Sequence, residues 1–144
     1  MERQAIVAPP ATLRIGDWGP QGLAFYGDSV AYRRTLELKP AADERVFLRV
    51  PDYRGVAIRV WVNGQTAGVI GWEPNEVEIT PLLTGGPDEL AIEVIGHRRN
   101  SHGPFHLKDR HPRWTGPGSY GVEREGYDLV PCGLMAPPQL VVRR

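Results

Sequence analysis

Residues 61–74, WVNGQTAGVIGWEP, contain the strongest local structural signal in this chain. Both central residues of a type I′ turn need a positive φ, and the pair Asn63-Gly64 tolerates that conformation best. The pair therefore predicts a tight β-hairpin. Trp61 and Trp72 stand near the two ends of the stretch, which could serve as scaffold or as a ligand surface. We expect mainly scaffold: a hairpin, a strand and a turn at Pro74.

A period-two alternation of apolar and polar residues continues on both sides of this hairpin. It recurs in VAYRRTLEL, RVFLRV, AIRVWVNG, EVEIT, DELAIEVI, GYDLV and QLVVRR, and no window shows a sustained helical stripe. TPLLTGG predicts one short helical turn, with Thr80 as its cap and Pro81 at its first position. About eight mostly antiparallel strands in one domain, residues 1–144, predict an all-β antiparallel β-sandwich of the jelly-roll type. The residues expected to share the inward faces are Tyr32, Arg34, Leu36, Leu38, Val46, Leu48, Val50, Ile58, Val60, Val62, Val77, Ile79, Leu90, Ile92, Val94, Tyr127 and Leu129.

The bulk composition is that of a soluble globular domain, with 41% hydrophobic and 24% charged residues in 144. Lys and Arg number 17, as do Asp and Glu, so the net charge is zero. This argues against nucleic-acid and membrane partners, because both need a basic field. Cys132 is the only cysteine, which excludes an internal disulfide and leaves the compartment open. The opening residues, MERQAIVAPPATL, suggest neither a signal peptide nor a membrane-spanning segment.

The order of these pieces resembles the galactose-binding-domain-like β-sandwich, and most closely the sugar-binding-type accessory domain of glycoside hydrolase family 2 and related large bacterial glycosidases. That pattern has a strand rich in Tyr and Arg, a V-x-V-N-G-x-x-x-G hairpin, a proline, a strand ending in D/E-I-T, an L-x-x-G turn and an N-x-L-x-I-x-V strand. Asp88 stands where the pattern has asparagine. The matching residues are Val60, Val62, Asn63, Gly64, Gly68, Pro74, Glu78, Ile79, Thr80, Leu82, Gly85, Leu90, Ile92 and Val94.

In such glycosidases the catalytic carboxylates lie in a separate barrel domain, and a chain of this length cannot hold one. The resemblance therefore implies a non-catalytic accessory domain, of the kind found at the C-terminus of a larger glycosidase. It would bind an oligosaccharide or polysaccharide through its end loops, or buttress the other domains of its parent chain. A protein-interaction domain that docks onto its parent chain is the alternative, and a small stand-alone hydrolase is a third hypothesis.

Aromatic residues in Gly- and Pro-rich loops are the main lead to a ligand site, because sugar C–H faces stack on aromatic rings while the hydroxyls need polar partners. The same aromatic residues could instead close the end of the sandwich, and Trp18 and Tyr26 share this ambiguity. The long segment from about residue 96 to 121 supplies most candidates, since loops of that length often carry function. The candidate carbohydrate-binding residues are Trp114, Tyr120, Asn100, His102, His106, Arg113 and Trp72.

Metal and catalytic sites have weaker support in the sequence. All four histidines, His97, His102, His106 and His111, fall within residues 97–111, but no cysteine or nearby glutamate completes a familiar ligand set. Ser101 beside His102 invites a hydrolase interpretation, yet adjacent loop residues are not expected to meet and no G-x-S-x-G motif is present. We therefore expect no cofactor, apart from a structural calcium ion for which Asp17, Asp28 and Asp128 are the candidate ligands.

Overall fold

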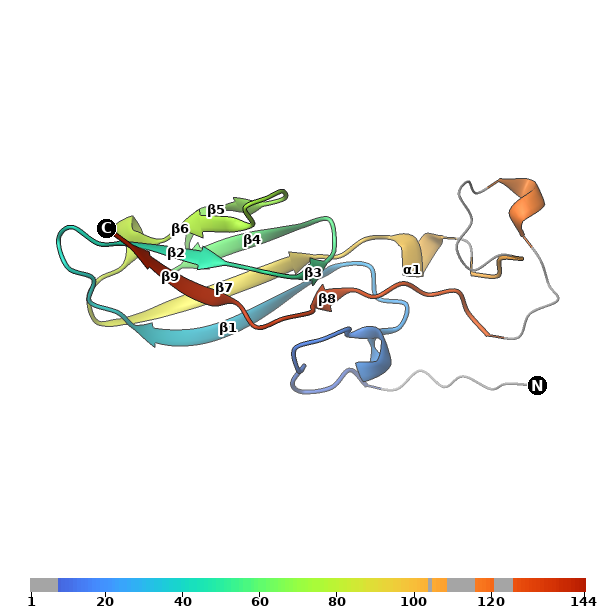
Figure 1. Ribbon diagram of the computed structural model, residues 1–144. Helices are drawn as coiled ribbons and strands as arrows, with labels where there is room; N and C mark the ends of the chain where they lie inside the picture. The colour runs from blue at the N-terminus through green and yellow to red at the C-terminus, as the bar shows by residue number, and fades with distance from the viewer. Residues whose placement is uncertain (1–7, 104, 109–115, 121–125) are drawn as a thin grey trace.

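The computed structural model describes residues 8–103, 105–108, 116–120 and 126–144 (Figure 1). Antiparallel strands dominate these residues, with four short helical turns among the connections. The strands are β1 (Ser29–Glu37), β2 (Arg45–Arg49), β3 (Tyr53–Arg54), β4 (Ala57–Val62), β5 (Gln65–Ile70), β6 (Glu76–Glu78), β7 (Pro87–Ile95), β8 (Gly133–Leu134) and β9 (Gln139–Arg143). The helical turns are η1 (Gly19–Leu23), η2 (Thr80–Leu82), α1 (Arg99–His102) and η3 (Pro117–Ser119). No helix in these described ranges is long and apolar enough to cross a membrane.

Two sheets form the sandwich, and their strand orders are β1-β7-β4-β5 and β6-β2-β9. The pair β3-β8 forms a small third sheet. The sheets approach closely where β5 faces β6, since a Cβ added at Gly68 would lie 2.7 Å from Cγ2 of Val77. The all-β antiparallel sandwich predicted from the alternation is therefore confirmed.

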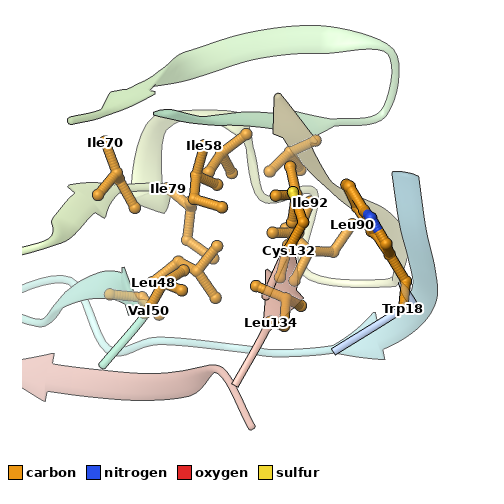
Figure 2. Packing of buried hydrophobic residues seen from close by; sticks show 14 residues of the cluster. Trp18, Leu48, Val50, Ile58, Ile70, Ile79, Leu90, Ile92, Cys132 and Leu134 are labelled. Atoms are coloured by element: carbon orange, nitrogen blue, oxygen red, sulfur yellow. The ribbon is translucent and has the colours of Figure 1, made fainter. Parts of the chain in front are cut away.

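The core lies between these two sheets, where Figure 2 shows side chains from both layers meeting. Each of β2, β4 and β7 contributes every second residue, as the period of two predicts. Burial of such aliphatic side chains stabilises the fold by about 1.5–3 kcal/mol each. The strand residues that are at most 6% exposed and were expected to point inward are Val46, Leu48, Ile58, Val60, Val62, Leu90, Ile92 and Val94.

The Asn63-Gly64 hairpin has the predicted type I′ geometry, with φ of 52° at Asn63 and 75° at Gly64. Asn63 also joins three segments through its side-chain amide. Its Nδ2 donates to the Leu82 carbonyl at 3.2 Å and to Oδ1 of Asp88 at 2.8 Å, while its Oδ1 accepts from the Glu89 amide at 2.9 Å. The pair thus fixes both the turn and its attachment to β7.

Two local predictions are wrong, each because a side chain hydrogen-bonds to the backbone of a residue distant in the sequence. GYDLV forms no strand, because the Asp128 carboxylate accepts a hydrogen bond from the Leu107 amide in another loop. Asp128 is therefore the buried residue of this stretch, and Tyr127 is 41% exposed. Thr80 does not cap the turn at 80–82, whose cap position is Ile79. The Oγ1 of Thr80 instead accepts a hydrogen bond from the Val46 amide of β2 at 2.7 Å, which ties the turn to the sheet.

One end of the sandwich carries most of the loops. Ser29 of β1 and Ala57 of β4 both pair with Ile95 of β7, and Ile58 pairs with Ile70 of β5, so these four strands meet at one level. The described residues 8–28, 71–75, 96–103, 105–108, 116–120 and 126–132 belong to the connections on this side, and Figure 1 shows α1 lying beyond the strand ends. We call this region the loop end; the Asn63-Gly64 hairpin lies at the opposite end.

Candidate functional site

Backbone hydrogen bonds tie the N-terminal part of the loop end to the segment around β8. The Gly16 amide donates to the Leu134 carbonyl at 2.6 Å, and the Trp18 amide donates to the Cys132 carbonyl at 2.9 Å. Asp17 reinforces this contact, because its Oδ1 accepts from the Gly19 amide at 2.9 Å and from the Cys132 amide at 3.1 Å. The carboxylate therefore has a structural task that requires no metal ion.

Trp18 belongs to the core and not to a ligand surface. It is 0% exposed and packs edge-to-face on Tyr26, with the ring centroids 6.1 Å apart. Figure 2 shows it beside Leu90 and Cys132 at the side of the buried cluster. Its Nε1 has no hydrogen-bond partner among the described residues. Trp18 thus closes the sandwich, which was the other role open to it from the sequence.

Asn100 on α1 acts as a clamp between two loops. It is 2% exposed; its Nδ2 donates to the Val130 carbonyl at 2.7 Å and its Oδ1 accepts from the Val130 amide at 2.9 Å. Both ends of the side-chain amide are therefore engaged by backbone. This arrangement disagrees with the prediction of Asn100 as a surface ligand for sugar.

Asp128 organises the next part of the loop end. Its amide donates to the Phe105 carbonyl at 2.7 Å, and its Oδ2 accepts from the Leu107 amide at 2.8 Å. Because Leu107 also forms a bridge with Tyr120, a single carboxylate positions three neighbouring stretches. Asp128 is 7% exposed, which suits a buried loop anchor.

These anchors bring four aromatic side chains together at the surface. Phe25, Phe105 and Tyr127 pack edge-to-face, with centroid distances of 5.8 Å for Phe25–Phe105, 5.0 Å for Phe25–Tyr127 and 6.1 Å for Phe105–Tyr127. His106 lies 5.2 Å from Tyr127 between ring centroids. Phe25 and Tyr127 are each 41% exposed, so this loop-end aromatic cluster presents apolar ring surface together with a hydroxyl and an imidazole.

The structure gathers only some of the predicted site residues at this cluster. His106 belongs to it, and Tyr120, 48% exposed, is connected to it through Leu107. Trp72 is 81% exposed on the separate turn 71–75, which is too exposed for a side chain that closes the end of the sandwich. Trp114 and Arg113 lie outside the described residues. Phe25 and Phe105 were not among the predicted residues, although their place beside Gly and Pro in GLAFYG and GPFH was a signal in the sequence.

Ser101 and His102 meet, contrary to the expectation for adjacent loop residues. Ser101 Oγ lies 2.8 Å from His102 Nδ1 and 3.3 Å from the Arg98 carbonyl. A nucleophilic site also needs a group that orients the base, and no carboxylate of the described residues hydrogen-bonds His102. The pair therefore offers polar groups at the exposed end of α1 without the remaining parts of a triad.

The predicted metal ligands remain apart in the described ranges of the chain. No three side chains of His, Cys, Asp or Glu within those ranges come together in a way that could hold a metal ion. Asp28 accepts from the Ser29 amide at 2.8 Å, and His97 Nε2 lies 3.2 Å from the Pro131 carbonyl. His111 is outside the described residues. Burial raises the pKa of the Cys132 thiol, which suits a packing role for this side chain.

Comparison with known proteins gives structural matches only. No family model and no curated protein matches the chain. A rhamnosidase from Novosphingobium sp. PP1Y superposes over 97% of this chain with a TM-score of 0.67 and 21% identity. The chain has the fold of a domain found in large bacterial glycosidases. An FMN-binding β-glucuronidase from Faecalibacterium prausnitzii L2-6 (92% of this chain, TM-score 0.52, 21% identity) and a β-D-glucuronidase of Dictyoglomus thermophilum (83%, 0.50, 20%) share it.

The matched region is a small part of each of those enzymes. This chain spans 14% of the rhamnosidase, 19% of the FMN-binding β-glucuronidase and 21% of the third enzyme. The superpositions establish a common fold, and fold by itself does not assign an activity. The match thus agrees with the resemblance drawn from the sequence, while the role of the domain has to be argued from its surface.

Proposed function

We propose that this chain is a non-catalytic accessory domain of a carbohydrate-active enzyme and that it buttresses the other domains of a parent glycosidase through its loop end. One observation carries the proposal: the rhamnosidase match covers 97% of this chain but only 14% of that enzyme. A unit that accounts for so small a share of a glycosidase is more simply an accessory domain than the seat of catalysis.

The loop-end aromatic cluster supports a docking role for this end. Its rings are partly exposed although they are large and apolar, and aromatic residues of this kind are enriched at the centres of protein interfaces. Trp72 adds an 81% exposed indole on another loop at the same level of the sandwich. Burying these rings against a neighbouring domain would remove apolar surface from water.

The test compares amide hydrogen exchange in the isolated chain and in the complete product of its gene. We expect residues 105–107 and 126–128 to exchange more slowly in the complete product, because a docked domain covers the cluster. The Asn63-Gly64 hairpin, at the opposite end, is the internal control and should exchange equally in both. Equal exchange at the cluster in the two samples would contradict docking at this end.

Carbohydrate binding by the same end is the second candidate function. It is favoured by the contact between His106 and Tyr127, which places polar atoms beside exposed ring surface. Tyr120, His102, Trp72, Trp114 and Arg113 remain predicted contributors. Tyr127→Ala would then weaken the binding of an oligosaccharide by about tenfold, the effect of losing an aromatic contact. Unchanged affinity would remove this candidate.

The non-catalytic part of the proposal has its own test. The purified chain is incubated with a panel of aryl glycosides, including rhamnosides, glucuronides and galactosides. We expect no release of the aryl group above the uncatalysed rate. Turnover that survives repeated purification would overturn the accessory role and revive the hypothesis of a stand-alone hydrolase.

A further inference from the structure

The outward face of the four-stranded sheet has a hollow that none of the preceding sites uses. Its volume is about 380 Å³, and strands β1, β4 and β7 line it. It lies on the face of the sheet that points away from the core shown in Figure 2. The hollow is therefore a surface of the sandwich body, distinct from the loop-end aromatic cluster.

A small residue on the central strand creates the hollow. Ala91 of β7 pairs with Arg33 of β1 on one side and with Trp61 of β4 on the other. Neighbouring strands are about 4.8 Å apart, so the two flanking side chains rise from strands about 10 Å apart. Because Ala91 has only a methyl group, the floor between these two side chains is low and apolar, and Ala31, which pairs with Glu93, extends it. The opening suits a single sugar ring.

Paired polar side chains surround this floor. Arg33 Nη1 lies 2.8 Å from Glu89 Oε1, and Arg59 Nη1 lies 3.3 Å from Glu93 Oε2. Trp61 Nε1 donates to the same Glu93 oxygen at 3.4 Å, and the Arg59 guanidinium carbon is 5.8 Å from the centroid of the indole ring. These contacts hold Trp61 in place before any ligand arrives, which lowers the entropic cost of binding.

We propose that this hollow is a binding site for one ring of a neutral glycan. The C–H face of a pyranose would pack on Trp61 and the two alanines, as sugar rings do on apolar and aromatic surface. Vicinal hydroxyls would donate to Glu89 and Glu93, whose oxygens have spare lone pairs, and accept from the guanidinium groups. The inference goes beyond the proposed function, since it uses a different surface from the loop end.

The charges of the hollow favour a neutral sugar over an acidic one. Arg33, Glu89 and Glu93 line it and Arg59 lies beside it, so that each glutamate already pairs with an arginine. An anionic sugar would bring an uncompensated charge next to two carboxylates, which is unfavourable. A neutral diol can satisfy acceptors and donors of the existing pairs without separating them.

A sugar also suits the hollow better than a protein partner does. An apolar protein surface would bury four charged side chains without replacing their water, and that desolvation is costly. The hollow is centred on β7, which pairs with a neighbour on both sides, so no free strand edge is available there for a peptide. Hydroxyl groups replace the lost water in a way that aliphatic side chains cannot.

The experiment titrates the full chain with neutral gluco-, xylo-, manno- and galacto-oligosaccharides, and with an oligogalacturonide as the acidic comparison. Heat and amide chemical shifts of the labelled chain are measured. We expect saturable binding of a neutral oligosaccharide, with shifts centred on residues 31–33, 59–64 and 89–93. Trp61→Ala removes the stacking ring and Ala91→Leu fills the floor; each should weaken association by about tenfold or more. Phe47→Ala is the matched control, because it removes an outward aromatic ring on β2 of the other sheet that also lies under an arginine.

Several outcomes would overturn the site. They are the absence of binding across the panel, shifts confined to residues 105–107 and 126–128, equal affinity for the oligogalacturonide, and full affinity in both Trp61→Ala and Ala91→Leu. The shift map uses the unmodified chain, so it decides the question even where a variant fails to fold. A failure to bind glycan in the hollow would not affect the hydrogen-exchange test of the loop end, because the two experiments report on different surfaces.

Discussion

At the scale of single residues, Trp18 shows how an aromatic side chain in a loop can belong to the core. It is 0% exposed, so Trp18→Ala should lower the free energy of unfolding by about 3–5 kcal/mol through lost burial and a cavity. Trp18→Phe should cost clearly less, because it keeps an aromatic ring and removes an indole N–H that has no partner among the described residues. Urea unfolding of both variants measures the difference.

Trp72→Ala is the matched control for this prediction. Trp72 is 81% exposed, and substitutions at such sites change stability by about 0.5 kcal/mol or less. A loss for Trp18→Ala no larger than that of Trp72→Ala would show that the indole does not hold the loop to the core.

Asp88 also acts at this scale, as the centre of a group of hydrogen bonds. It is 0% exposed, and its Oδ1 accepts from Asn63 Nδ2 at 2.8 Å, Thr84 Oγ1 at 2.8 Å and the Thr84 amide at 3.1 Å. Asp88→Ala removes these acceptors and should destabilise the fold by about 1–3 kcal/mol. Asp88→Asn keeps one acceptor oxygen and should cost less. Equal losses in the two variants, measured by thermal unfolding, would contradict this role.

At the scale of elements, the β4–β5 hairpin depends on the left-handed conformation of its turn. Gly64 has φ of 75°, and a side chain in that region costs about 1–2 kcal/mol. Gly64→Ala should lower stability by about this amount although nothing lies within 4 Å of the added Cβ. Gly71→Ala is the matched control, since its Cβ also meets open space but its backbone is not left-handed. Equal stabilities of the two variants, in urea unfolding, would contradict the argument.

The individual elements also differ in how well the sequence predicts them. Strands such as β4 and β7 were predictable because their inward residues repeat with a period of two and each strand pairs along its whole length. GYDLV has the same alternation, but Asp128 binds the Leu107 amide, and that contact holds its residues in a loop. The prediction of Thr80 as a helix cap failed for a related reason, since its hydroxyl hydrogen-bonds to the backbone of β2. Local periodicity carries no information about such long-range hydrogen bonds.

At the scale of the whole molecule, the candidate sites depend on contacts between distant segments. The loop-end aromatic cluster joins Phe25 to residues about a hundred positions later through anchors such as Asn100 and Asp128. The hollow on the outer sheet face needs the register of β1, β7 and β4 at once. Composition and motifs indicated aromatic loops, yet only the assembled fold shows which rings meet.

Three carboxylates with lowered pKa values hold distant parts of the fold together. A hydrogen bond from Asn63, helped by Thr84, lowers the pKa of Asp88. Hydrogen bonds from Arg143 of β9 and then Arg49 of β2 lower that of Glu76 on β6. The Ala41 amide, followed by Arg144, lowers that of Glu44. All three groups therefore bind protons more weakly in the folded chain than in the unfolded chain.

This arrangement predicts that the fold loses stability in acid. Because the unfolded chain binds more protons below the ordinary carboxyl pKa of about 4, the stabilisation is complete above that value and is lost as the pH falls toward the lowered folded values. The urea midpoint should thus fall between about pH 5 and pH 3. Asp88→Asn should make this fall shallower, since it removes one of the groups. A midpoint independent of pH in this range would mean that these hydrogen bonds and ion pairs do not stabilise the folded carboxylates in solution.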